Sequence, residues 1–83
     1  MKKIKCNAID YRKGFIEVTT NGHAGLINLE CWNVQAGEDI SKVTDDLSPI
    51  KDEYFTGNVE LELTPENAKE LIKSLEKILK TNS

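Results

Sequence analysis

The sequence predicts an α+β domain: an antiparallel sheet of about four strands, with one C-terminal amphipathic helix packed on one face. Three observations support this fold class. Apolar and polar residues alternate over 58–63, apolar residues recur at helical spacing over 65–80, and an Asn-Gly pair separates two further alternating stretches. Because the chain has 83 residues, we expect a single domain over residues 1–83.

The C-terminal part of the chain combines a half-buried strand with a capped helix. Val59, Leu61 and Leu63 alternate with polar residues, which is typical of a strand with one buried face. Thr64 is suited to the N-cap of the next helix and Pro65 to its first position. An apolar stripe follows, and we expect it to pack on the sheet. The stripe consists of Ala68, Leu71, Ile72, Leu75, Ile78 and Leu79.

The N-terminal half predicts three strands, over 2–9, 15–20 and 23–34. The Asn-Gly pair at 21–22 favours a two-residue hairpin, in which Ile16 pairs with Ile27. That register gathers the apolar residues on one face, so the turn and the hydrophobic pattern agree. The apolar face would carry Ile16, Val18, Ile27, Leu29 and Cys31, with Ile4 and Cys6 pointing inward from the first strand. The other face is mostly polar but includes Phe15, Leu26 and Trp32.

Residues 35–57 show no continuous period. Ile40, Val43 and Leu47 have helical spacing, which favours a short helix or turn. The predicted helix would lie near 40–47, and an irregular strand is the alternative interpretation.

Composition and charge limit the class of protein. The net charge is −3, and residues 35–57 carry six acidic against two basic side chains. No long apolar run or secretory signal is present, so we expect a cytoplasmic protein without a membrane segment. The two cysteines, Cys6 and Cys31, are expected to be free and buried in that reducing compartment. The basic residues are scattered, which argues against nucleic-acid binding.

The polar residues predict no catalytic site, no metal site and no cofactor. The single histidine, His23, and the two cysteines lack the close pairing of a zinc site. No phosphate-binding loop, dinucleotide fingerprint or nucleophile elbow is present. Glu60 and Glu62 share a strand face, which is typical of a solvated surface. An enzyme that uses Cys31 or this carboxylate pair is the alternative.

Two surface features are candidates for binding a protein partner. The group formed by Phe15, Leu26 and Trp32 is either an interface or a part of the core that residues 35–57 cover. The acidic segment over 38–53 is suited to a basic partner. The predicted partner-binding residues are Phe15, Leu26, Trp32, Glu38, Asp39, Asp45, Asp46, Asp52, Glu53 and Tyr54.

Residues 63–79, LTPENAKELIKSLEKIL, resemble the tail of many short phage and bacterial proteins. The small size, acidity and lack of motifs are similar to phage-encoded inhibitors of host defence, including anti-CRISPR proteins. The resemblance implies a non-enzymatic binding module that occludes a host protein. Two alternatives remain open: an oligomeric protein that binds a small molecule or nucleotide, and a structural domain. A homodimer is compatible with each of them.

Overall fold

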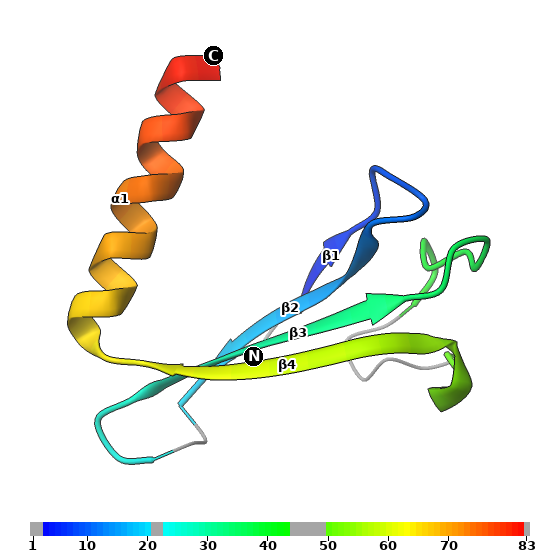
Figure 1. Ribbon diagram of the computed structural model, residues 1–83, viewed down its shortest axis with the longest axis horizontal. Coiled ribbons are helices and arrows are strands. Elements are labelled where there is room, and N and C mark those ends of the chain that lie inside the picture. Colours follow the sequence, from blue (N-terminus) through cyan, green and yellow to red (C-terminus); the bar gives the residue numbers. More distant parts are fainter. Residues whose placement is uncertain (1–2, 21–22, 44–49, 83) are drawn as a thin grey trace.

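The computed structural model describes residues 3–20, 23–43 and 50–82. Those residues have the predicted α+β architecture, an antiparallel sheet followed by a C-terminal helix (Figure 1). The strands lie in the order β1-β2-β3-β4, so each strand pairs with its neighbour in the sequence. The elements are β1 (Ile4–Cys6), β2 (Lys13–Thr19), β3 (Ile27–Val34), the short 3₁₀ helix η1 (Asp52–Tyr54), β4 (Phe55–Leu63) and α1 (Pro65–Asn82).

The hairpin between β2 and β3 is longer than predicted. Ile16 pairs with Cys31 rather than with Ile27, a displacement of four residues. The cause is a second turn, in which the Leu26 amide donates to the His23 carbonyl at 3.0 Å and Gly25 takes a φ of 81°. Side chains alternate between the two faces of a sheet with a period of two residues. A register displaced by four residues therefore leaves each side chain on the face that was predicted for it. Asn21 and Gly22 lie outside the described residues.

One face of the sheet is apolar on all four strands, as the alternation predicted. This apolar face is continuous because the register places Ile4, Ile16, Cys31 and Val59 in one row across the sheet. Its members are Ile4, Cys6, Ile16, Val18, Ile27, Leu29, Cys31, Val59, Leu61 and Leu63. The opposite face, here called the covered face, carries the side chains that alternate with these residues along the strands.

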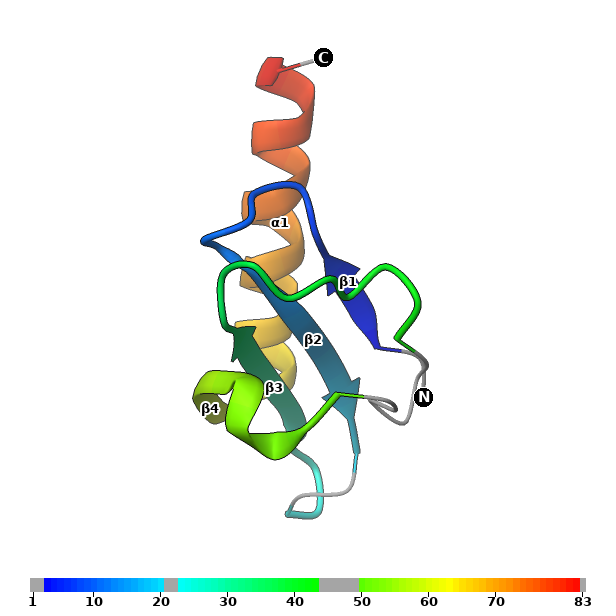
Figure 2. The same cartoon turned by 90° about the vertical axis from the view of Figure 1, so that its right-hand side faces the viewer.

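The core of the chain lies on the covered face. Phe15 is 3% exposed and packs with Val34 and with Ile40, which is fully buried. Figure 2 shows residues 35–43 running from the end of β3 toward β1. Trp32, Ile50 and Phe55 pack against this cluster. The described residues between β3 and β4 therefore form a second layer over one end of the sheet.

The helix does not pack on the sheet, which corrects that part of the prediction. A single residue, Thr64, separates β4 from α1, and the helix makes few contacts with that strand. It extends away from the sheet at one end (Figure 1). The physical reason is the junction: Pro65 has a fixed φ, and Thr64 is held by two hydrogen bonds to Asn67. This rigid cap sets the direction in which the helix leaves the strand.

The predicted short helix near 40–47 is absent from the described part of that segment. Residues 40–43 instead form a turn, the alternative to a helix in that prediction, in which the Val43 amide donates to the Ile40 carbonyl at 3.1 Å. The remaining positions of the prediction, 44–49, lie outside the described residues. Ile40 and Val43 point into the core, which explains their helix-like spacing without a helix.

Candidate interaction surface

The apolar face of the sheet is open to solvent along its length. Its side chains are exposed or half-buried, and Leu61 of β4 is 57% exposed. Val59 and Val18 are also exposed. Strands place these residues on one face through their two-residue period, and the same period places the core residues on the other. The chain therefore leaves uncovered the face that the sequence predicted to be the core.

The apolar stripe of α1 is the second uncovered surface. The exposed fraction rises from 41% at Leu71 to 68% at Leu79, because the helix moves away from the sheet along its length. The helix stripe consists of Ala68, Leu71, Ile72, Leu75, Ile78 and Leu79. Together with the apolar face it accounts for nine of the eleven large hydrophobic side chains that are exposed among the described residues.

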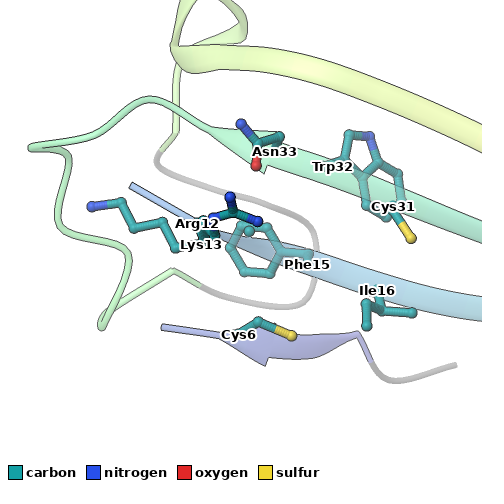
Figure 3. A pocket seen from close by; sticks show the side chains of 9 residues that line it. Cys6, Arg12, Lys13, Phe15, Ile16, Cys31, Trp32 and Asn33 are labelled. Carbon is teal, nitrogen blue, oxygen red and sulfur yellow. The ribbon is translucent and has the colours of Figure 1, made fainter. Parts of the chain in front are cut away.

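Two shallow depressions interrupt the apolar face where glycines replace side chains. Gly14 and Gly57 both pair with Asn33, one on each side of β3. The depression at Gly14 has a volume of about 260 Å³, and Figure 3 shows Cys6 and Cys31 among its lining residues. The depression at Gly57 has a volume of about 320 Å³. Both are open surfaces that could receive an apolar side chain from a partner.

The predicted aromatic group does not form an exposed patch. Phe15 is in the core, and Trp32 is half-buried beside it, with the Lys3 ammonium 5.7 Å from its ring centroid. Leu26 is half-buried after the hairpin turn, outside the strands. Tyr54, at the end of η1, is also half-buried. Of the two interpretations given for Phe15 and Trp32, the structure supports a core that the 35–54 segment covers.

The predicted acidic residues lie around the covering segment. Asp39, Asp52 and Glu53 are exposed, whereas Glu38 is half-buried. The Asp39 carboxylate accepts a hydrogen bond from the Ser41 amide at 2.9 Å, which lowers the pKa of Asp39. Asp45 and Asp46 lie outside the described residues. The described carboxylates are thus distributed along a loop rather than gathered at one point.

A row of carboxylates crosses the exposed half of the covered face. Glu17, Glu30 and Glu60 occupy directly paired positions on β2, β3 and β4. The pKa of Glu60 is raised by a hydrogen bond with Glu30 and by the negative charge of the Glu30 carboxylate. Lys3 forms an ion pair with Glu17 at 2.9 Å. Lys3 and Lys5 lie at the β1 end of the sheet, and Glu60 and Glu62 lie on β4 at the opposite edge.

The residues that could carry catalysis have structural partners. His23 Nδ1 lies 2.7 Å from the Glu62 carboxylate, and the His23 amide donates to it at 2.9 Å. These contacts lower the pKa of Glu62 and fasten the hairpin to β4. Cys6 and Cys31 are free thiols on the apolar face, separated by β2, and neither is buried. The prediction that both cysteines are buried is therefore wrong for a single chain.

A buried lysine ties two loops together. Lys13 is 4% exposed, and its ammonium donates to the Asp10 carboxylate at 2.7 Å and to the Glu38 carbonyl. Asp10 also accepts from the Gly37 amide at 3.0 Å. The lysine and this amide lower the pKa of Asp10. We call these contacts the Lys13 clasp. A buried charge is unusual, but the ammonium of Lys13 is paired with a carboxylate and a carbonyl, so the lysine has a structural role.

Comparisons with known proteins give no assignment. The chain matches no protein family, no characterised protein and no solved structure. Within residues 3–20, 23–43 and 50–82, no three His, Cys, Asp or Glu side chains are grouped so as to hold a metal ion. None of the helices in the described part of the chain combines the length and apolar composition that spanning a membrane requires.

Sequence reasoning identified the residues of the uncovered surfaces but assigned them to the core. Val59, Leu61 and Leu75 were expected to contact one another within one chain. The signal that points elsewhere is the single residue, Thr64, between strand and helix. With a proline directly after it, this connection restricts how the helix can turn back over the sheet.

Proposed function

We propose that this protein is a non-enzymatic protein-binding module, and that its binding surface is the apolar face together with the helix stripe. The observation that carries the proposal is the exposure of nine large hydrophobic side chains on these two surfaces. Monomeric proteins rarely expose contiguous apolar patches of more than a few hundred Å², and larger ones mark interaction sites. A partner that covers them would gain the free energy of apolar burial.

The arrangement of the polar groups supports binding rather than catalysis. A catalytic site needs a nucleophile or base with free access to substrate, together with an enclosing pocket. In the described residues, His23 is engaged by Glu62, and Lys13 by Asp10 and Glu38. The depressions at Gly14 and Gly57 are open, and their volumes are near or below the lower limit of about 300 Å³ for ligand pockets. The small-molecule alternative is therefore less favoured.

The mode of action that fits such a surface is occlusion of a partner protein. An extended apolar face without a reactive group can act by covering a site, as the proposed inhibitor of a host protein would. The acidic residues around the covering segment on the opposite face, including Asp39, Asp52 and Glu53, would accelerate encounter with a basic partner. They are expected to change the association rate more than the affinity.

Photo-crosslinking at one helix position tests the proposal. Leu75, in the middle of the helix stripe, is replaced by a photo-reactive phenylalanine analogue in cells that express the full chain. We expect covalent adducts with protein. Lys77, on the opposite side of α1, is the matched control and should give few adducts. Crosslinks confined to the chain's own sheet, or the same adducts from both positions, would show that the helix stripe is not a protein-binding surface.

A further inference from the structure

We infer that the partner of this surface is a second copy of the same chain. In this homodimer, α1 of each copy packs across the apolar face of the other. The inference rests on the proposed function of this surface in protein binding, and it names a second copy, in place of a host protein, as the occupant. Its starting point is that one chain carries two uncovered apolar surfaces of complementary form, a helix stripe and a sheet face.

Helix and sheet match in size. α1 has 18 residues and is therefore about 27 Å long. β4 has nine residues and spans about 30 Å. A helix about 10 Å wide covers about two strands that are spaced about 4.8 Å apart. One helix per sheet therefore covers the centre of the apolar face, around Cys31 and Leu61, and the depressions at Gly14 and Gly57 can receive its branched side chains.

The junction favours exchange between chains. The reciprocal hydrogen bonds of Thr64 and Asn67, at 3.0 and 3.1 Å, fix the first turn of the helix. Pro65 fixes the backbone next to it. The helix therefore leaves the end of β4 in a direction that points away from its own sheet (Figure 1), and its stripe stays exposed. Short connections that prevent an element from folding back on its own chain favour exchange of that element between copies.

The surface area of a single chain is too large for a compact monomer. It exposes 6351 Å², whereas a folded chain of 9.3 kDa is expected to expose about 5,000 Å². The excess is about 1,400 Å² per chain, so two chains could bury about 2,800 Å², which is within the range of obligate homodimers. The radius of gyration is 14.2 Å, against about 12 Å for a compact domain of this length.

A twofold dimer would also cover the apolar face and the helix stripe of both copies at once. If the helix of one copy covers the sheet of the other, symmetry requires the reciprocal contact, and the assembly closes. An unrelated partner would need to supply a helix-like surface for the sheet and an apolar groove for the helix. The second copy already carries both.

The mass of the full chain in solution is the first test. Size-exclusion chromatography with light scattering is expected to give twice the 9.3 kDa chain mass. Leu61→Lys introduces a charge into the apolar face and should weaken dimerisation by about 100-fold. Glu60→Lys, the neighbouring position on the opposite face, is the matched control and should leave the dimer intact.

A longer hinge tests the exchange and covers the case in which Leu61→Lys fails to fold. Inserting six Gly and Ser residues between Leu63 and Thr64 lets α1 reach its own sheet. We expect a folded monomer, with the helix content and the thermal stability retained. A linker variant that stays dimeric would overturn helix exchange.

A disulfide locates the contact. In a chain with Cys6→Ser and Leu75→Cys, oxidised glutathione should join the new thiol to Cys31 of the second copy and produce a covalent dimer. Lys77→Cys should give much less of it. Adding Cys31→Ser should abolish the product, which separates it from a bond between two introduced thiols.

The outcomes distinguish this inference from the proposed function. A monomer that forms photo-adducts with another protein at Leu75 would overturn the homodimer and leave the binding module standing. A monomer in which the new thiol bonds to Cys31 of its own chain would overturn both. A dimer whose covalent product persists without Cys31 would contradict the helix-on-sheet contact.

Discussion

Gly14 lies on β2, between two neighbouring strands. It pairs with Cys6 of β1 on one side and with Asn33 of β3 on the other. Its φ is +157°, and a Cβ at this position would overlap the carbonyl oxygen of Trp32. A larger residue must therefore push β3 away. The glycine permits the close approach of β2 and β3, and it also produces the depression on the apolar face.

Gly14→Ala is expected to reduce the free energy of unfolding by at least about 2 kcal/mol, because of the overlap and the backbone strain. Gly57→Ala is the matched control. A Cβ there would meet only the Asn33 Cβ at 3.5 Å, an ordinary contact, so its effect should be within about 1 kcal/mol. Urea unfolding of both variants measures the difference. Equal effects would contradict the role given to Gly14.

The Lys13 clasp has a pH dependence with a definite sign. Its hydrogen bond to Asp10, with that from Gly37, lowers the pKa of Asp10 below the ordinary value of 3.8. A carboxyl with a lowered pKa stabilises the fold above its ordinary pKa and loses this contribution as the pH falls through the lowered value. Asp10→Asn should therefore destabilise the protein at pH 7, and the difference from the wild type should shrink below pH 3.8.

Thermal unfolding of the wild type and Asp10→Asn from pH 7 to pH 2 measures this effect. Asp52→Asn, which removes the charge of an exposed aspartate in η1, is the matched control. A constant difference between the wild type and Asp10→Asn at every pH would show that Asp10 does not act through its charge.

At the scale of elements, the segment between β3 and β4 acts as the second layer of the core. Ile40 is fully buried against Phe15 and Val34. The ammonium groups of Lys5 and Lys13 anchor the segment to the sheet, because they donate hydrogen bonds to the Ser41 and Glu38 carbonyls, respectively. Residues 35–43 therefore belong to the folding unit, although they contain no helix or strand.

Ile40→Ala is expected to cost about 2–5 kcal/mol, the range for truncating a buried isoleucine. Ile9→Ala removes the same atoms from a side chain that is 47% exposed and should cost about 0.5 kcal/mol or less. Chemical denaturation of both variants gives the comparison. If the two losses were similar, the segment would not be part of the core.

The junction of β4 and α1 is the element on which the dimer depends. The Thr64 hydroxyl accepts from the Asn67 amide at 3.0 Å, so Thr64→Ala should cost about 1 kcal/mol of helix stability. Thr64→Ser keeps the hydroxyl and should be close to the wild type. The helix signal in far-ultraviolet circular dichroism, followed during heating, reports on both. A loss of equal size in the serine variant would show that the hydroxyl is not what stabilises the cap.

The sequence predicts the fold class and the faces because both depend on short-range patterns. Alternation fixes which side chains of a strand share a face, and the displacement of the β2–β3 register by four residues preserves that parity. The Asn-Gly signal was insufficient for the register, because the turn at Gly25 competes with it. The core under residues 35–43 was one of two interpretations, since this segment has no period to indicate it.

The position of the helix could not be read from its amphipathic pattern. A stripe such as that around Leu75 predicts that one side of a helix becomes buried, but the pattern does not say in which chain. The direction of α1 depends on the geometry of a single residue, Thr64, and its cap. The apolar face was not predicted as a binding surface, because Val59 and Leu61 were expected to be covered by the helix of their own chain.

At the scale of the whole molecule, the account predicts that stability depends on concentration. α1 has few contacts within its own chain, and helices in proteins gain most of their stability from packing. If a second copy supplies this packing, unfolding is coupled to dissociation. A tenfold increase in protein concentration should then raise Tm by about 3–5 °C. A Tm that does not change between micromolar and millimolar protein would contradict the coupling.

The most direct measurement is an isotope-filtered nuclear Overhauser experiment on a mixture of labelled and unlabelled chains. Such spectra retain only contacts between different copies. The account predicts contacts between the methyl groups of Leu75 and Ile78 in one copy and those of Val59 and Leu61 in the other. If these contacts occur only within a single chain, or if neither set of methyl groups contacts the other, the apolar face is not the binding site for the helix of a second copy.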